Sequence, residues 1–226
     1  MKWLLPLAVA VLVPLVSAAD RASPPPLDSD EADVIRTVLV RCAGEAKEFW
    51  QDVDAKNAQT MLGPDATTQR ARSVVADTTG TGLAAYGFVY DLDRPANDRA
   101  FARVRKSSAF AIYREPGRST RSLAPVADVD AIVLKPFEQL PRDPARSLRK
   151  GTTEIDLVDP EAFYRRYPDA ASLIIVGRPA IDGDEAVVYV AQMVVYGIEG
   201  RVFRLRRAGL KWTVDAVAVL EDTPGC

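Results

Sequence analysis

The chain contains no histidine, and this absence limits the chemistry that its side chains can perform. Its 226 residues include 29 lysines and arginines and 31 aspartates and glutamates, but no histidine at all. Imidazole is the side chain that gains and loses a proton near neutral pH. Its absence therefore excludes Ser-His-Asp triads, Cys-His dyads, HExxH zinc sites and histidine-ligated haem. A catalytic site in this chain would have to use serine, lysine or carboxylates.

Ser147 and Lys150 match the S-x-x-K pattern of penicillin-binding proteins and β-lactamases. In those enzymes the two residues lie one helical turn apart, so that the lysine amine can take the serine proton. The partner patterns Ser-Asp-Asn and Lys-Thr-Gly are missing, because residues 150–152 read Lys-Gly-Thr. A match at two fixed positions arises by chance, so we do not expect an active site here.

Carboxylates offer a second kind of chemistry without imidazole. Asp91 with Asp93, and Glu154 with Asp156, are each spaced to share one face of a strand, and glycoside hydrolysis uses two carboxylates. Nothing in the sequence brings such groups together, so solvated faces are the favoured interpretation. The acids within residues 182–185 are too few to coordinate Ca²⁺, and their glycine favours a turn. We therefore predict no catalytic residue, no metal and no cofactor.

Six aromatic and basic side chains are the candidates for binding a ligand. Amphipathic rings often line ligand pockets, and two arginines on one face of a strand can bind a carboxylate or a phosphate. The alternative for the rings, including the further ring of Tyr196, is the core between helix and sheet, and for the arginines a solvent-facing surface. The six candidates are Tyr164, Tyr167, Tyr189, Arg204, Arg206 and Trp212.

The first 19 residues have the features of a secretory signal peptide. Lys2 precedes an apolar run from Trp3 to Val16, and small residues then suit signal peptidase. The run is shorter than the about 20 residues of a membrane-spanning helix, although an uncleaved anchor is the alternative. We expect a periplasmic or secreted protein without a transmembrane anchor after cleavage, with residues 20–29 as a proline-rich linker and residues 30–226 as a single domain.

The two cysteines, Cys42 and Cys226, leave two interpretations open. An oxidising destination would let a disulfide between them persist. However, Cys226 is the last residue, where fraying is common, and Cys42 continues the apolar stripe of a helix. A buried free thiol therefore explains Cys42 equally well.

The charge of the chain argues against nucleic acid as a partner. The net charge is −2, whereas nucleic-acid-binding proteins concentrate a basic excess. Bases outnumber acids between residues 98 and 150. A solvated, arginine-rich face is the favoured interpretation of that excess, and an anion-binding patch is the alternative.

Hydrophobic spacing and turn residues predict the elements that must position these side chains. In the first part of the chain we expect a helix with Asp28 or Ser29 as its cap, followed by a second helix that ends at Gly63-Pro64. Prolines weaken the signal from residue 93 to 159. The predicted elements are helices at 30–42, 45–62 and 97–106, strands at 73–78, 83–90, 108–113 and 152–158, and an apolar run at 131–134.

The last third of the chain gives the clearest pattern. Asp159-Pro160 is a helix start, with an aspartate cap and a proline at the first helical position. Four strands follow, at 172–177, 185–196, 201–207 and 211–220, and the glycine turns between them, including 197–200, require antiparallel neighbours. We predict an α+β fold in which helices pack on a curved antiparallel sheet that ends in a four-stranded meander. Such sheets often form a half-open cone around an apolar cavity.

Several residues of this last third form a recognisable pattern. They are Phe-Tyr-Arg-Arg-Tyr-Pro at 163–168, Ile174, Ala-Val-Val-Tyr-Val at 186–190, and then Gly200, Leu205, Trp212 and Val214. The pattern resembles an uncharacterised family of exported bacterial proteins with FYxxYP, AxVYV and closing Gly, Leu and Trp-x-Val signatures, over about residues 160–220. The closing hairpin also resembles NTF2-like domains. Where many family members carry Cys and Gly after the AxVYV strand, this chain has Gln192, Val194 and Tyr196. The resemblance implies export and an α+β fold, and it implies no activity.

Together these patterns predict an exported, non-catalytic module of the cell envelope that binds a small ligand or an envelope protein. The alternative is a carboxylate-dependent hydrolase without histidine. A hydrolase needs two acids that converge in a cleft, one of them with a raised pKa. A binding module should instead have an apolar cavity or an exposed patch without such a pair.

Overall fold

The computed structural model describes residues 23–63, 66, 68–80, 99–113, 118–150, 153–195 and 197–220. For residues 142–150, 153–157 and 198 it describes the backbone alone. The predicted signal peptide, the predicted strand 83–90, and Asp91, Asp93, Tyr196 and Cys226 lie outside the described residues.

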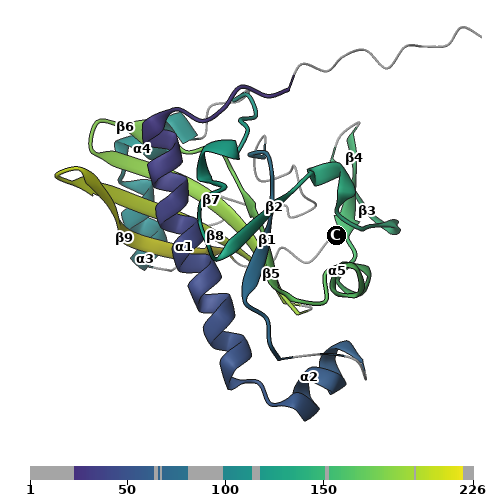
Figure 1. The fold of residues 1–226 in the computed structure, drawn as a ribbon. Coiled ribbons are helices and arrows are strands. Elements are labelled where there is room, and N and C mark those ends of the chain that lie inside the picture. Colours follow the sequence, from purple (N-terminus) through teal and green to yellow (C-terminus); the bar gives the residue numbers. More distant parts are fainter. Residues whose placement is uncertain are drawn as a thin grey trace, which may run out of the picture.

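The described residues are built around a curved, open sheet of seven strands (Figure 1). Six strands follow one another across the sheet in the order β2-β1-β5-β7-β8-β9, and short β6 pairs with β7. The strands are β1 (Arg72–Ala76), β2 (Ile132–Lys135), β5 (Ala170–Val176), β6 (Ala180–Asp182), β7 (Glu185–Val194), β8 (Gly197–Ala208) and β9 (Lys211–Leu220). A separate antiparallel pair is formed by β3 (Arg142–Lys150) and β4 (Thr153–Val158).

Strands β5, β7, β8 and β9 form the predicted antiparallel meander, with β7 between β5 and β8. The predicted turn at residues 197–200 is wrong, because these residues belong to β8 and Val194 pairs with Gly197. The chain turns at Val195 instead, which has a φ of 55°. A valine rarely adopts this left-handed backbone, so sequence rules did not place the turn there.

The other half of the sheet is parallel. β1 pairs in parallel with both β2 and β5, so the sheet as a whole is mixed. The apolar run at 131–134 is thus the edge strand β2. The direction of these strands depends on pairing between distant segments, which local periodicity does not report.

Residues Ser29–Asp52 form one long helix, α1, where the sequence predicts two. Asp28 accepts a hydrogen bond from the backbone of Glu31 at 2.8 Å, and the Glu31 side chain accepts one from the backbone of Asp28, which completes a capping box. Gly44 does not break the helix, because the buried stripe continues through Ala46 and Trp50. A second helix, α2 (Ala55–Leu62), follows after a short break.

Three short helices and two 3-10 turns complete the part of the fold that the structure describes. They are α3 (Arg99–Arg105), α4 (Ser108–Tyr113), α5 (Pro160–Arg166), η1 (Ala124–Val126) and η2 (Phe137–Gln139). The predicted strand at 108–113 is wrong, because this segment is α4. A short apolar run has no decisive period, and here the edge-on contact of Phe110 with Phe101 of α3, at 6.2 Å between ring centroids, favours the helix.

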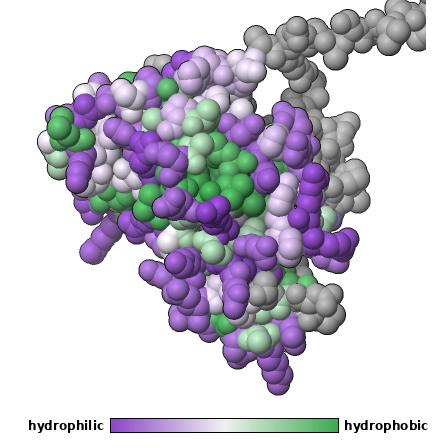
Figure 2. All heavy atoms as spheres, in the orientation of Figure 1, coloured by the Kyte–Doolittle hydropathy of each residue, from purple (hydrophilic) through white to green (hydrophobic). Residues whose placement is uncertain are grey.

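Both faces of the sheet are covered, which confirms the predicted α+β class. α1 crosses one face, where Val38 and Leu39 pack against Val188 and Phe203 in one apolar cluster (Figure 1). α3, α4 and α5 cover the opposite face, where a second cluster gathers around Tyr189. Figure 2 shows hydrophobic residues at the middle of the face that α1 crosses. Among the described residues, no helix has both the length and the apolar content that crossing a bilayer requires.

Candidate functional site

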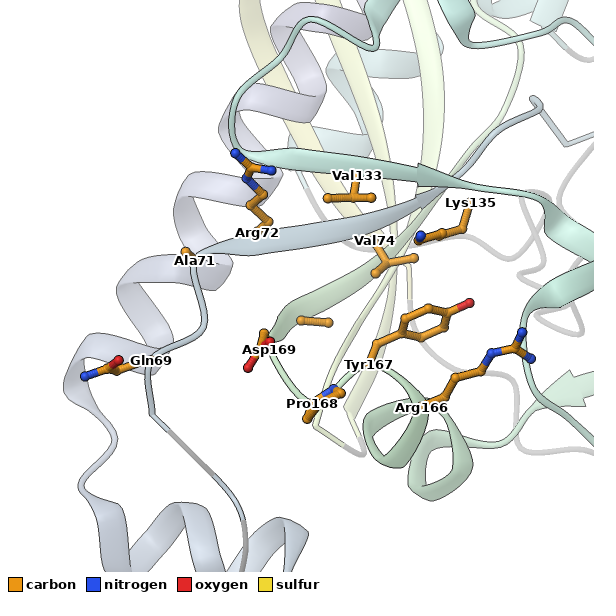
Figure 3. A pocket seen from close by; sticks show the side chains of 11 residues that line it. Gln69, Ala71, Arg72, Val74, Val133, Lys135, Arg166, Tyr167, Pro168 and Asp169 are labelled. Carbon is orange, nitrogen blue, oxygen red and sulfur yellow. The ribbon is translucent and has the colours of Figure 1, made fainter.

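A pocket of about 380 Å³ lies where the parallel strands β1 and β2 meet the segment that leads from α5 into β5 (Figure 3). Pockets that bind small molecules span about 300–1,000 Å³. Side chains of the two apolar clusters cover both faces of the meander in the described part of the chain. The pocket at the parallel edge of the sheet is therefore our candidate site.

Helix α5 brings the first wall of the pocket into place. Asp159 caps the helix by accepting a hydrogen bond from the backbone of Ala162 at 3.1 Å, and Pro160 occupies the first turn. At the other end Tyr167 closes the last turn, and the backbone N–H of Ala170 donates to its carbonyl at 3.0 Å. This tight connection from helix to strand presents Tyr167 and the residues beside it to the start of β1.

Arg70 connects the segment before β1 to the start of β5, the two sides of the pocket. Its guanidinium donates to the carbonyl of Ala170 at 2.9 Å, and it lies 4.5 Å from the ring centroid of Trp50 and 5.1 Å from that of Tyr164. The side chain is buried, and desolvation lowers its pKa from the usual arginine value. Because Arg70 precedes β1 and Ala170 begins β5, this contact fixes the pocket walls relative to each other.

The floor of the pocket is apolar and one wall is aromatic. Val74 and Val133 are register partners on β1 and β2, and both line the pocket together with Ala170. The ring of Tyr167 lies beside Val74 in Figure 3 and packs against Phe163, at 5.2 Å between ring centroids. Tyr167 is only half-buried, so part of its ring is open to a ligand.

The rim of the pocket is cationic. Arg72, Lys135 and Arg166 line it, with Asp169 as the acid among the lining residues. Within the described part of the chain, none of the three bases forms an ion pair with a carboxylate. Arg166 lies 5.7 Å from the ring centroid of Tyr167. The hydroxyl end of that ring points between Lys135 and Arg166 in Figure 3.

The structure distributes the four predicted rings over different places. Tyr167 lines the pocket. Tyr164 and Tyr189 are buried in the apolar cluster beneath α3, α4 and α5. Trp212 belongs to the cluster beneath α1, and the Arg207 guanidinium lies 4.5 Å from its ring centroid. These rings therefore do not converge on one site.

The predicted arginine pair, Arg204 and Arg206, lies away from the pocket and is occupied by carboxylates. Both arginines form ion pairs with Glu185, Arg204 by a direct hydrogen bond and Arg206 at 3.4 Å, and Arg204 also lies 3.4 Å from Asp215. Ser107 donates its hydroxyl to Glu185 at 2.7 Å. The arrangement is a closed ionic network that joins β7, β8 and β9 to the segment between α3 and α4.

The carboxylates give little support to the hydrolase alternative. Desolvation acts to raise the pKa of Glu185, but hydrogen bonds from Ser107 and Arg204 outweigh it and lower that pKa below the usual glutamate value. A general acid needs the opposite shift. Asp182 and Glu185 close the β6–β7 hairpin, whose Gly183 has a φ of 56°. Among the described residues, no three metal-ligating side chains cluster.

The S-x-x-K residues lie on a strand. Ser147 and Lys150 belong to β3, whose extended backbone separates residues three positions apart by about 10 Å. The motif requires one helical turn instead, so its serine and lysine do not have the backbone arrangement of those enzymes. Glu154 and Asp156 lie on β4, and their side chains are outside the described part.

Cys42 is a free, fully buried thiol on α1. Burial raises its pKa to about 12, so the reactive thiolate is strongly disfavoured. Its backbone carbonyl accepts a hydrogen bond from Gln192 on β7 at 2.9 Å. The structure thus describes Cys42 as the buried free thiol that was one of the two interpretations. Cys226, the partner in the alternative disulfide, lies outside the described residues.

Sequence reasoning did not single out Arg72, Lys135 or Arg166. Two features of the sequence could have indicated them. Arg166 lies inside the FYxxYP segment. Lys135 follows the apolar run 131–134 and belongs to the basic stretch 98–150, for which an anion-binding patch was the alternative interpretation. Their convergence requires the parallel pairing of β1 with β2 and β5, which local patterns do not encode.

Comparisons of the chain with protein-family models, with curated proteins and with solved structures find no match. The resemblance to a family of exported bacterial proteins therefore stays a prediction. The candidate site is argued from its own geometry.

Proposed function

We propose that this protein is an exported, non-catalytic binding module that holds a small ligand in the pocket between β1, β2 and α5. One observation carries the proposal: the pocket combines an apolar floor, a half-buried tyrosine and three bases that have no carboxylate partner among the described residues. Ligand sites typically have this composition, with mostly apolar walls and a few polar groups that fix the orientation of the ligand.

Binding fits the pocket better than hydrolysis does. Hydrolysis by two carboxylates needs a second acid within about 5–9.5 Å of the first. Asp169 is the carboxylate among the described lining residues, and the other described acids of this region do not line the pocket. The bases at the rim suit recognition of a ligand charge, which needs no proton transfer.

Native mass spectrometry of the protein purified from the compartment to which its host exports it tests the proposal. We expect wild-type protein to carry a small molecule that dissociates on collisional activation. Val133→Trp should fill the pocket at its floor, so we expect to detect this variant without the bound molecule. Its circular dichroism spectrum and melting temperature provide the check that it folds. Bare wild-type protein, or equal loading of wild type and variant, would contradict the proposal.

A further inference from the structure

We propose that the ligand of this pocket is an organic monoanion with a flat apolar body. This inference rests on the proposed function and names the class of ligand. The anionic group lies between Lys135 and Arg166, and the apolar body lies on Val74 and Val133 against the ring of Tyr167.

The charge of the ligand follows from the distribution of charged groups around Tyr167. The hydroxyl end of the ring points between Lys135 and Arg166, whereas Asp169 and the third base, Arg72, lie away from that end (Figure 3). An anionic group is therefore attracted most strongly to the end between Lys135 and Arg166, because the opposite charges of Arg72 and Asp169 offset each other at the other end. Neither Lys135 nor Arg166 is neutralised by an ion pair within the described residues, and both are donors that suit a carboxylate or related oxyanion.

The shape of the ligand follows from the apolar surfaces. Val74 and Val133 lie side by side on adjacent strands, so their side chains form one continuous apolar surface at the floor of the pocket. The Tyr167 ring stands beside this floor and is held by its contact with Phe163. A flat body can contact the floor and stack against the ring at the same time, and aromatic pairs contribute beyond simple burial.

Calorimetry with 2-naphthoate and 2-naphthamide tests both parts of the inference. The two probes share one apolar body, and only the first is charged. We expect 2-naphthoate to bind at least about tenfold more tightly than 2-naphthamide, and inorganic phosphate, which lacks the body, to bind no better than 2-naphthamide. Equal affinity for the two naphthalene probes, or no binding of 2-naphthoate, would overturn the inference.

Two neighbouring arginines on α5 provide a matched pair of variants. Arg166→Gln removes a base of the pocket. This substitution should weaken the affinity for 2-naphthoate about tenfold and leave the affinity for 2-naphthamide unchanged. Arg165→Gln is the control, because Arg165 is exposed and pairs with Glu161 at 2.7 Å outside the pocket. Arg165→Gln should leave the affinity for both probes unchanged. Equal effects of the two substitutions on 2-naphthoate would show that general surface charge is responsible and would overturn the assignment.

The outcomes separate this inference from the proposed function. If native protein carries a molecule that Val133→Trp excludes, and 2-naphthoate still does not bind, the ligand class is wrong and the binding function stands. If native protein is bare and 2-naphthoate does not bind, both are wrong.

Discussion

The hydroxyl of Tyr164 holds the turn between β7 and β8 from inside the core. It accepts a hydrogen bond from the backbone N–H of Val195 at 2.8 Å, and Val195 has a φ of 55°. A left-handed backbone costs a residue with a side chain about 1–2 kcal/mol. Burial raises the pKa of Tyr164 to about 12, so the hydroxyl stays protonated at ordinary pH. Tyr164 is thus both a core ring and the anchor of a strained turn.

Replacing Tyr164 with phenylalanine should lower the free energy of unfolding by about 1–2 kcal/mol, because the buried N–H of Val195 loses its acceptor. Urea denaturation followed by fluorescence measures the change. Tyr167→Phe is the control, since the hydroxyl of Tyr167 lies at the pocket and we expect a change below about 0.5 kcal/mol. Equal losses in the two variants would contradict the anchoring role.

Glu185 should make stability depend on pH. Its pKa is lowered in the folded protein, since hydrogen bonds from Ser107 and Arg204 outweigh the effect of desolvation. The folded state therefore favours the carboxylate, so its contribution is complete above the usual pKa of 4.5 and is lost as pH falls through the lower, folded value. Glu185→Gln should lower the free energy of unfolding by about 2 kcal/mol at pH 7. This difference from wild type should become smaller as the pH falls below the usual pKa.

Chemical denaturation of both proteins between pH 3 and pH 7 (a range set by the usual glutamate pKa) measures this gap. Glu161→Gln serves as a control, because the Glu161–Arg165 pair is exposed and such pairs contribute about 0.5 kcal/mol or less. A gap that stays constant across the range would be inconsistent with the ionic network described for Glu185.

Helix α5 is the element that connects local sequence to the candidate site. Its start was readable from Asp159-Pro160 alone, because the cap and the first-turn proline act within one turn. Its end carries Arg166 and Tyr167 to the pocket. Loss of the cap should therefore affect stability and ligand binding together.

Asp159→Ala should lower the free energy of unfolding by about 1 kcal/mol and weaken 2-naphthoate binding. Asp54→Ala is the matched control, because Asp54 caps α2 through the backbone of Asn57 at 2.7 Å and lies outside the pocket. Its stability loss should be similar, with unchanged binding. Weakened binding in both variants would mean that α5 has no special part in shaping the pocket.

Other elements show where sequence reasoning reaches its limit. The strand Lys211–Leu220 was predicted with its observed bounds, because the glycine turn at Ala208-Gly209 that precedes it is a local signal. The segment 108–113 was not, because its packing on Phe101 and not its own period selects the helix. The turn at Val195 also escaped prediction, since its stabilising partner, Tyr164, lies 31 residues earlier in the chain.

At the scale of the whole molecule, the pocket is assembled from three distant segments, 69–74, 133–135 and 166–170. Tyr167 was a predicted site residue because a ring in this segment is an obvious candidate. Arg72 and Lys135 gain their place only through the parallel pairing of β1 with β2 and β5. Sequence patterns thus predicted the fold class and one wall of the site, whereas the charged rim required the tertiary structure.

The proposed export also concerns the whole chain. We expect protein recovered from outside the cytoplasm to begin after Ala18 or Ala19, as intact-mass measurement would report. Val11→Arg places a charge inside the apolar run and should block this processing, whereas Ser23→Arg in the linker should not. Recovery of exported protein that still begins at Met1 would contradict cleavage of the predicted signal peptide.

Amide NMR spectroscopy can show whether the pocket between β1, β2 and α5 is the ligand site. The small molecules released by denaturing the natively purified protein are added back to isotopically labelled, ligand-free protein. We predict shifted amide signals within residues 69–74, 133–135 and 166–170, with little change in β8 and β9. Shifts concentrated in β8 and β9, or no shifts at all, would show that this pocket is not the ligand site.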